Sequence, residues 1–345
     1  MRGVAKRAEC CGFPQRFAYP RVQRGLTGAT QVTTQIDWLH DRLHGVGEPV
    51  VIDGGMGTQL EKVGVAMHND VWSGEAVLSD PDAVRRVHED FIRAGAEVII
   101  TNTFSTARHA LEPGDLGEHV ASINTNAVRL AQQARESAAE RPVAIFGSIC
   151  EWTFNRESEW NRPEAVGESV REQARLLHAA GVDALALEMC ERVEFSIPSI
   201  EAAMETGLPL WIGVSARRHK GSEAIATFDY ADRSLDALVG ALAKYPAMAM
   251  NIMHSPIPDV AQALEVVREH WKGPVGVYPE SGFFSMPNWQ FVDVISPEGL
   301  AEAARGWVRD GVRMVGGCCG LGPEHITAVC NALKRDGSRS VLREG

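Results

Sequence analysis

Short apolar runs rich in β-branched residues alternate with longer amphipathic stretches from Ile36 onward. This alternation is typical of repeated βα units on a parallel sheet. The apolar runs predict eight strands, at residues 49–53, 97–101, 143–148, 183–188, 209–214, 247–252, 274–278 and 312–316. The amphipathic stretches predict eight helices, near residues 80–95, 116–139, 163–180, 193–205, 231–244, 257–272, 297–310 and 322–335.

Eight strands and eight helices over about 300 residues are the count of a (β/α)8 TIM barrel, so we expect a single-domain α/β barrel. A doubly wound open sheet is the alternative, although such sheets more usually have roughly five to seven strands. No G-x-G-x-x-G sequence follows the first predicted strand, and no Walker A sequence occurs anywhere. The sequence therefore disfavours a nucleotide cofactor.

Residues 1–33 lack sustained apolar periodicity and carry six basic residues against one acidic residue, Glu9. We expect them to form a basic, disordered leader and the barrel to occupy residues 34–345. Upstream translation of non-coding sequence is a second interpretation of this segment. An organellar transit peptide, which is also rich in arginine and poor in acidic residues, ranks below both.

The composition is that of a soluble globular protein, with 45% hydrophobic and 23% charged residues. No run of about 18 apolar residues is present to span a membrane. The net charge of −11 argues against nucleic acid as a partner, because phosphate binding needs a basic face. Since no secretory hydrophobic region is present, we expect a cytoplasmic protein whose partners are small molecules. The sequence leaves a homo-oligomer open.

Seven cysteines, an odd number in a chain of 345 residues, argue against a disulfide framework and for reduced thiols. Two of them, Cys318 and Cys319, follow an apolar predicted strand and lie between Gly317 and Gly320. The C-terminal ends of the strands build the catalytic face of a barrel, and glycine lets the backbone turn sharply there. Both sulfurs can then point into the barrel mouth, which favours a zinc site over two small buried side chains.

A zinc ion with an open position needs a third protein ligand. The strand predicted at residues 247–252 would supply it from across the mouth, but Ile252 stands at its end and cannot coordinate a metal. Residues two apart on a strand face the same side, so His254 is a candidate if the strand extends that far. Cys150 and Cys190 are further candidates, and a purely structural His254 stays open.

Several predicted strand ends carry small, polar or thiol residues in a characteristic order. They are Asp53-Gly54-Gly55-Met56-Gly57-Thr58, Thr101-Asn102-Thr103-Phe104, Gly147-Ser148, Leu187-Glu188, Tyr278-Pro279-Glu280-Ser281-Gly282, and residues 315–326 with their Gly-Gly-Cys-Cys-Gly sequence. Ala94-Gly95-Ala96 leads into the strand that ends at Thr101 and belongs to the same series of motifs. Together these motifs resemble the homocysteine S-methyltransferase family over residues 46–335.

The resemblance implies an S-methyltransferase with a zinc-dependent barrel. Such an enzyme moves a methyl group from a small onium donor, such as S-methylmethionine or betaine, to the thiol of homocysteine and forms methionine. Members usually offer three zinc cysteines, the first in an Asn-Cys element, whereas here Asn251 is followed by Ile252. A same-fold methyltransferase with another thiol or selenol acceptor, and a catalytically weak thiol-binding or metal-binding relative, are the alternatives.

The resemblance and the residue chemistry together suggest roles for the strand ends. Glu188 suits the ammonium group of the acceptor, and the loop from Gly54 to Thr58 offers backbone N–H donors for its carboxylate. The full set of predicted substrate-binding residues is Asp53, Gly54, Gly55, Thr58, Asn102, Thr103, Glu188 and Tyr278. The predicted metal ligands are Cys318, Cys319 and His254, and no catalytic residue is predicted beyond them.

A positively charged methyl donor is expected to bind against aromatic faces, because the quadrupole of an aromatic ring attracts a cation. Candidates by position are Trp72, Phe104, Trp152, Tyr278, Phe283 and Trp289. For any one of them, packing in the core or in a lid is the simpler interpretation.

Overall fold

The computed structural model describes residues 36–45, 47–68, 71–152, 157–285 and 290–341. The boundary predicted after residue 33 lies outside these residues. Eight parallel strands form one sheet in the order β1-β12-β9-β8-β5-β4-β3-β2. The strands are β1 (Val50–Val51), β2 (Val98–Ile100), β3 (Ala144–Cys150), β4 (Ala184–Cys190), β5 (Leu210–Val214), β8 (Ala249–Pro256), β9 (Val275–Glu280) and β12 (Met314–Val315).

The sheet closes into a barrel where its first and last strands meet. A parallel bridge joins Ile52 to Val98, and the Asp53 N–H donates to the Val98 carbonyl at 3.0 Å. Each of the eight predicted strands overlaps one of the observed strands. The predicted (β/α)8 barrel is therefore confirmed.

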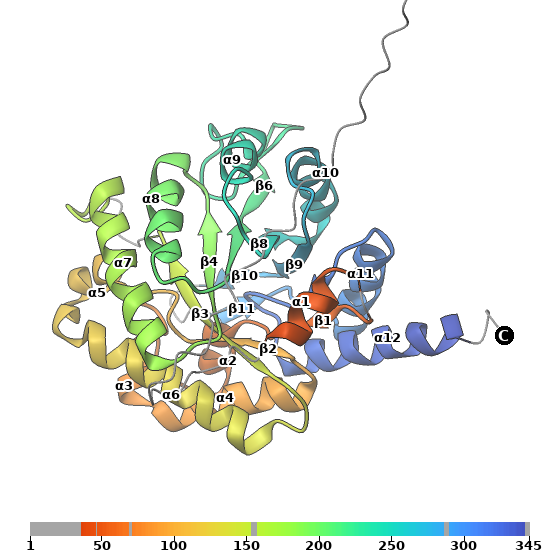
Figure 1. Ribbon diagram of the computed structural model, residues 1–345, viewed down its shortest axis with the longest axis horizontal. Coiled ribbons are helices and arrows are strands. Elements are labelled where there is room, and N and C mark those ends of the chain that lie inside the picture. Colours follow the sequence, from red (N-terminus) through yellow and green to blue (C-terminus); the bar gives the residue numbers. More distant parts are fainter. Residues whose placement is uncertain (1–35, 46, 69–70, 153–156, 286–289, 342–345) are drawn as a thin grey trace, which may run out of the picture. The chain divides into compact units, whose positions relative to one another are not determined.

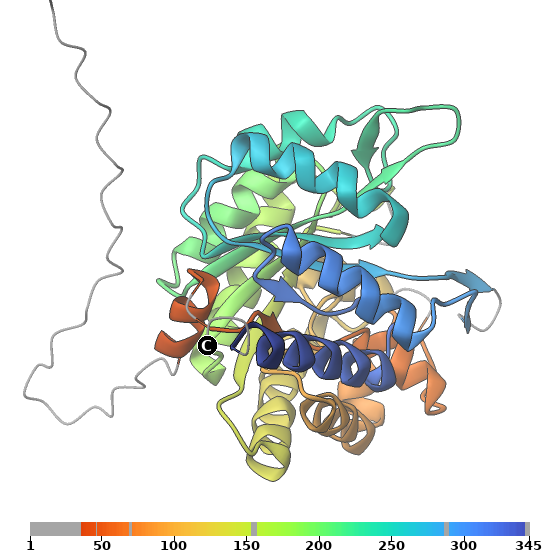
Figure 2. The ribbon, with the colours of Figure 1, turned by 90° about the vertical axis from the view of Figure 1, so that its right-hand side faces the viewer.

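Helices surround the sheet (Figure 1). The eight that follow the predicted stretches are α4 (Pro81–Ala94), α6 (Val120–Ala138), α7 (Pro163–Ala180), α8 (Val193–Met204), α9 (Leu235–Leu242), α10 (Val260–His270), α11 (Pro297–Arg309) and α12 (Pro323–Val341). Four of them begin with proline, which has no N–H to leave unpaired at a helix start. Figure 2 shows α11 and α12 side by side on the outside of the barrel.

Shorter elements occupy the two ends of the barrel. They are α1 (Asp37–Leu43), α2 (Met56–Lys62), α3 (Ala76–Ser79), α5 (Arg108–Leu111), three 3-10 turns (Glu112–Gly114, Gly117–His119 and Ile257–Asp259), and two hairpins, β6–β7 (Ala216–Arg218 and Ile225–Thr227) and β10–β11 (Phe283–Ser285 and Gln290–Val292). Leu39 and Leu43 of α1 pack with apolar side chains inside the barrel. Both hairpins follow the C-terminal ends of barrel strands, where they extend the mouth.

The core has two layers. The outer layer consists of aliphatic side chains packed between the sheet and the helices. The inner layer fills the barrel and includes Phe146, Trp211 and Tyr278, whose rings follow one another at centroid distances of 4.5 and 5.8 Å. Strand residues alternate between these layers, so the apolar strands are buried on both faces.

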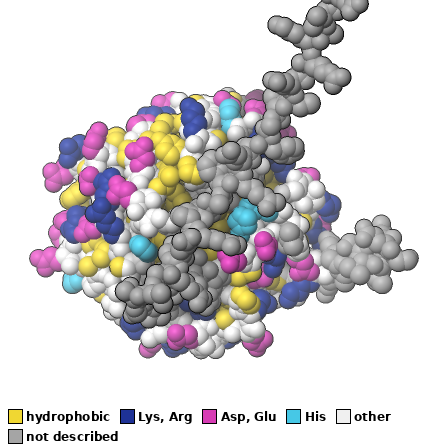
Figure 3. Space-filling view, viewed as in Figure 1, with side chains coloured by type: hydrophobic (Ala, Val, Ile, Leu, Met, Phe, Trp, Pro, Cys, Tyr) yellow, Lys and Arg dark blue, Asp and Glu magenta, His cyan; other side chains and the backbone are white. Residues whose placement is uncertain are grey.

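Charged side chains of both signs are interspersed on the molecular surface (Figure 3). Arg171 of α7 pairs with Glu168 on its own helix and with Glu205 at the end of α8. Such exposed pairs contribute little to stability individually. No helix in the described part of the chain is both long and apolar enough to cross a bilayer.

The inner layer should dominate the stability of the barrel. We expect Phe146→Ala to lower the free energy of unfolding by about 3–5 kcal/mol, because a fully buried ring is replaced by a cavity. Urea unfolding followed by circular dichroism measures this change. The control, Phe283→Ala, removes a ring that is 56% exposed and should change the free energy by less than about 0.5 kcal/mol. Equal losses in both variants would contradict the two-layer description.

Candidate active site

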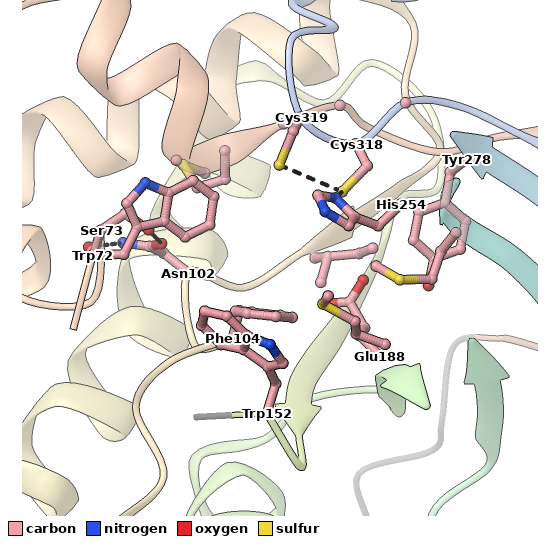
Figure 4. Close-up of a pocket in the computed structure, with 18 of the residues that line it drawn as sticks. Trp72, Ser73, Asn102, Phe104, Trp152, Glu188, His254, Tyr278, Cys318 and Cys319 are labelled. Carbon is pink, nitrogen blue, oxygen red and sulfur yellow. Dashed lines mark hydrogen bonds between the residues drawn. The ribbon is translucent and has the colours of Figure 1, made fainter. Parts of the chain in front are cut away.

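A cavity of about 350 Å³ opens at the C-terminal ends of the strands (Figure 4). Its walls come from segments that are far apart in the sequence. They are the loop after β1, the segment between α2 and α3, the ends of β2, β4, β8 and β9, the segments after β3 and β7, and the loop after β12. This is the position at which barrel enzymes place their active sites. Residues predicted separately from strand ends thus meet around one space.

The loop after β12 carries Cys318 and Cys319 into this cavity. Gly320 adopts φ +82°, and a Cβ at that position would come within 2.1 Å of the Ser281 carbonyl oxygen. The Cys318 N–H donates to the Pro279 carbonyl at 2.8 Å, and the Ser281 N–H donates to the Cys319 carbonyl at 3.1 Å. The loop is thereby fixed against the end of β9, with the two sulfurs 3.9 Å apart.

His254 reaches the two cysteines from β8, but regular alternation of side chains along the strand does not place it there. Residues 252 and 254 were expected on one face, yet Ile252 packs in the outer layer of the core while His254 lines the cavity. The pairing of β8 with β9 shifts register between Met253 and Pro256, and His254 has φ +41°. Such a bulge redirects the side chain that follows it. The expectation that residues 252 and 254 share a face is therefore wrong, although His254 does reach the cavity.

The three side chains lie close enough together to hold a metal ion. The Cys318 sulfur lies 3.6 Å from Nδ1 of His254, and the ligand atoms of His254, Cys318 and Cys319 all lie within 4.8 Å of one another. Tetrahedral zinc, with Zn–S bonds of about 2.3 Å and Zn–N bonds of about 2.1 Å, separates two sulfurs by about 3.8 Å and a sulfur from a nitrogen by about 3.6 Å. The observed 3.9 and 3.6 Å match these separations.

The electrostatics of the cluster follow from burial and mutual contact. The hydrogen bond with Cys319, followed by burial, raises the pKa of Cys318 well above its ordinary value, and His254 opposes this shift. Burial lowers the pKa of His254, but its contact with Cys318 and the charge of Glu280 outweigh burial and raise that pKa to about 9. A buried thiol whose pKa is raised, as that of Cys318 is, needs a nearby cation to become ionised at neutral pH.

Glu188 faces the cavity from the end of β4. Its residue is 6% exposed, and the Ser148 hydroxyl donates to Oε2. Burial raises the pKa of this carboxyl to about 7, although the Ser148 and Tyr278 hydroxyls oppose the shift. Tyr278, also in the cavity wall, has its own pKa raised by burial and by the charge of Glu188. A cationic group beside Glu188 would stabilise the ionised carboxylate.

Three other predicted substrate-binding residues are engaged beneath the surface of the cavity. The Ile100 N–H donates to the Asp53 carboxylate at 2.8 Å, and burial raises the pKa of Asp53. The Thr58 hydroxyl donates to the Gly55 carbonyl and accepts from the Gly320 N–H. The Thr103 hydroxyl donates to the Ser148 carbonyl at 2.7 Å. These contacts brace the loops that carry the cavity wall.

The remaining predicted residues line the cavity. Both ends of the Asn102 amide bond Ser73, which fixes the amide in place. Gly54 and Gly55 lie against the cysteine loop, where a Cβ on Gly55 would approach the Cys318 carbonyl oxygen to 2.6 Å. The Gly55 N–H donates to Leu321, so it is already engaged.

Aromatic side chains form one wall of the cavity: in Figure 4, Phe104 and Trp152 lie across from the cysteines and Trp72 lies to one side. The rings of Trp72, Phe104 and Trp152 line the cavity, with centroids 6.4 and 6.3 Å apart along the series. Phe283 is largely exposed on its hairpin, and Trp289 lies outside the described residues. Cys150 and Cys190 are buried in the inner and outer layers of the core.

Phe228 and Asp229, which were not predicted as site residues, also line the cavity. The Phe228 ring packs against His254 at a centroid distance of 4.6 Å, with the two ring planes tilted by 54°, and Trp152 Nε1 donates to the Asp229 carboxylate at 2.9 Å. They follow the β6–β7 hairpin, which lies between a predicted strand and a predicted helix. The one feature of the sequence that could have indicated them is this pair of an aromatic and an acidic residue in the connection between that strand and that helix.

Comparisons with known proteins agree with this geometry. The family model described as homocysteine S-methyltransferase matches residues 50–333. An S-methylmethionine–homocysteine S-methyltransferase of Rattus norvegicus is 28% identical over 298 residues, which cover 83% of this chain and 79% of that protein. Homocysteine S-methyltransferase 2 of Zea mays is 24% identical over 325 residues, covering 86% of this chain and 93% of that protein.

A solved structure shows the same fold. The metallated form of the homocysteine methyltransferase MmuM from Escherichia coli superposes with a TM-score of 0.67 at 23% identity, covering 85% of this chain and 98% of that one. The family match covers most of the chain, from β1 to α12. The chain therefore belongs to the homocysteine S-methyltransferase family.

Proposed function

We propose that this chain transfers a methyl group from a small onium donor to the thiol of homocysteine, forming methionine, with zinc held by Cys318, Cys319 and His254. The observation that carries the proposal is the arrangement of these three ligands and Glu188 around one cavity. Family membership and the named activities of the relatives support the acceptor.

The metal ligands prepare the acceptor sulfur. Zinc bound by two thiolates and one imidazole would keep an open position and lower the pKa of a substrate thiol. Without such help a thiol with a pKa of about 8.5 stays mostly protonated at neutral pH, and the thiolate is the nucleophile. The loop contacts of Cys318 and Cys319 keep both ligands fixed at the cavity wall.

Glu188 is the group best placed to bind the ammonium of the acceptor. It is the carboxylate at the end of β4, and it lies on the cavity wall with the Ser148 hydroxyl fixing one of its oxygens. An ion pair in this buried place would orient the amino acid so that its thiol reaches toward the cysteines. In Figure 4 the His254 imidazole lies between Cys318 and Glu188, and Tyr278 lies to one side of them.

The aromatic wall suits a cationic donor. Trp72, Phe104 and Trp152 present ring surfaces to the cavity, and the acidic side chains among its described lining residues are Glu188 and Asp229. In the transfer, the acceptor sulfur forms a bond to the methyl carbon while the bond from that carbon to the donor sulfur or nitrogen breaks. The electron pair of that bond stays on the donor atom, which loses its positive charge, and the thiol proton is released to solvent.

A donor panel tests the proposed reaction. Purified full-length chain with zinc is given homocysteine and, separately, S-methylmethionine, betaine or dimethylsulfoniopropionate, and methionine is measured by mass spectrometry. We expect methionine with at least one onium donor, loss of the product after chelation, and its return on adding zinc. Absence of methionine with every donor, or formation that a chelator does not affect, would contradict the proposal.

Metal content tests the ligand set. We expect about one zinc per chain in the purified protein, loss of that zinc in Cys318→Ala, and weaker retention in His254→Ala, because a three-ligand site loses a bond in each. Cys330→Ala is the matched control, since Cys330 is a buried cysteine of α12 that bonds the Gly95 carbonyl instead. Plasma mass spectrometry gives the stoichiometry. Zinc retained by Cys318→Ala at the parent level would rule out this site.

The acceptor assignment is tested by Glu188→Gln. We expect the KM for homocysteine to rise about 10- to 100-fold, the range for a lost charge-assisted hydrogen bond, while the KM for the donor changes less than twofold. Glu151→Gln, which alters a buried carboxyl outside the cavity lining, is the control and should leave both values unchanged. Steady-state kinetics with each substrate varied separately decides the matter. Equal effects on both substrates would place the acceptor elsewhere.

A further inference from the structure

The imidazole of His254 has a neighbour on each side. Its Nδ1 faces the Cys318 sulfur at 3.6 Å, and its other nitrogen, Nε2, lies 3.4 Å from Oε2 of Glu280. The Phe228 ring packs against the imidazole at 4.6 Å between centroids. These three contacts fix both the position and the rotation of the ring.

Glu280 is brought to this position by the same irregularity of β8 that turns His254 into the mouth. After the register shift that follows Met253, Pro256 pairs with Glu280 at the end of β9. Both side chains of the His254–Glu280 pair are largely buried, at 14% and 11% exposure. A buried carboxylate beside an imidazole is a strong partner, because the low local dielectric weakens its screening.

We propose that Glu280 is a positioning residue for the metal site: its carboxylate accepts the Nε2–H of His254 and so directs Nδ1 to the metal. This inference rests on the zinc-dependent function proposed above. Metal-binding histidines commonly donate their second N–H to a carboxylate, which fixes the tautomer and raises the basicity of the ligand.

The charge of Glu280 has a chemical consequence. The charges of two thiolates, one neutral imidazole and Zn²⁺ sum to zero. Electron donation from the ligands to the metal would keep a sulfur bound to it nucleophilic. A carboxylate on the far side of the imidazole adds negative charge without occupying a ligand position. Glu280 thereby supports both the affinity of the metal and the reactivity of the acceptor thiolate.

The test compares the parent protein with Glu280→Gln and the control Glu191→Gln. Glu191 is a buried carboxyl near His254 that accepts a hydrogen bond from the Asp229 N–H. This control therefore distinguishes a general effect of negative charge from the direct contact that Glu280 makes. Zinc affinity is measured by competition with a chromophoric chelator, and Co²⁺ substitution reports ligand geometry by its visible absorption bands. We expect Glu280→Gln to weaken zinc binding about 10- to 100-fold and to shift the Co²⁺ bands. Glu191→Gln should stay within twofold of the parent and keep its spectrum.

Three results would overturn the inference. The first is a Glu280→Gln variant that binds zinc as tightly as the parent and has the same Co²⁺ spectrum. That result would leave the proposed function intact, because the parent would still bind zinc. The second is an equal loss in both variants, and the third is a parent that binds no zinc, which would remove the proposed function as well.

A measurement on the parent protein alone covers the case in which Glu280→Gln does not fold. Nitrogen-15 NMR of the zinc-loaded chain should show His254 with Nδ1 bound to metal and a proton on Nε2 that exchanges slowly with solvent. Metal on Nε2, or a rapidly exchanging Nε2 proton, would contradict the assignment.

Discussion

The register shift in β8 is the constraint on which the site depends. A non-glycine residue at φ +41° costs on the order of 1–3 kcal/mol, and such a cost persists only where surrounding packing fixes it. Here Phe228, Glu280 and Cys318 surround the imidazole and hold it in place. Without the bulge, strand alternation would keep residue 254 on the face of Ile252, away from the cysteines.

The position of the two cysteines depends on close approach between the loop after β12 and the loop after β1. Gly55 lets the loop after β1 lie against the Cys318 carbonyl, and Gly320 adopts a backbone conformation that favours glycine. The Thr58 hydroxyl then links the two loops by bonding the Gly320 N–H. Many of the motif residues therefore serve to place the sulfurs, and fewer of their side chains line the cavity than the motifs suggest.

The sequence was informative about the barrel because apolar strands and amphipathic helices repeat with clear periods. It was equally informative about Glu188, Tyr278 and the cysteine pair, since strand ends of a barrel converge on one face. It could not reveal the bulge at His254, because a register shift depends on the neighbouring strand. Nor could it separate Thr103, whose hydroxyl bonds backbone, from Asn102, which lines the cavity, since that difference depends on tertiary contacts.

X-ray absorption at the zinc edge tests most directly whether the bulge completes a metal site. For the zinc-loaded full chain without substrate, we expect two sulfur scatterers, the outer-shell pattern of one imidazole, and one further light atom. Homocysteine should replace that light atom with a third sulfur. Three sulfurs before homocysteine is added, or no imidazole pattern at all, would show that His254 is not the third ligand.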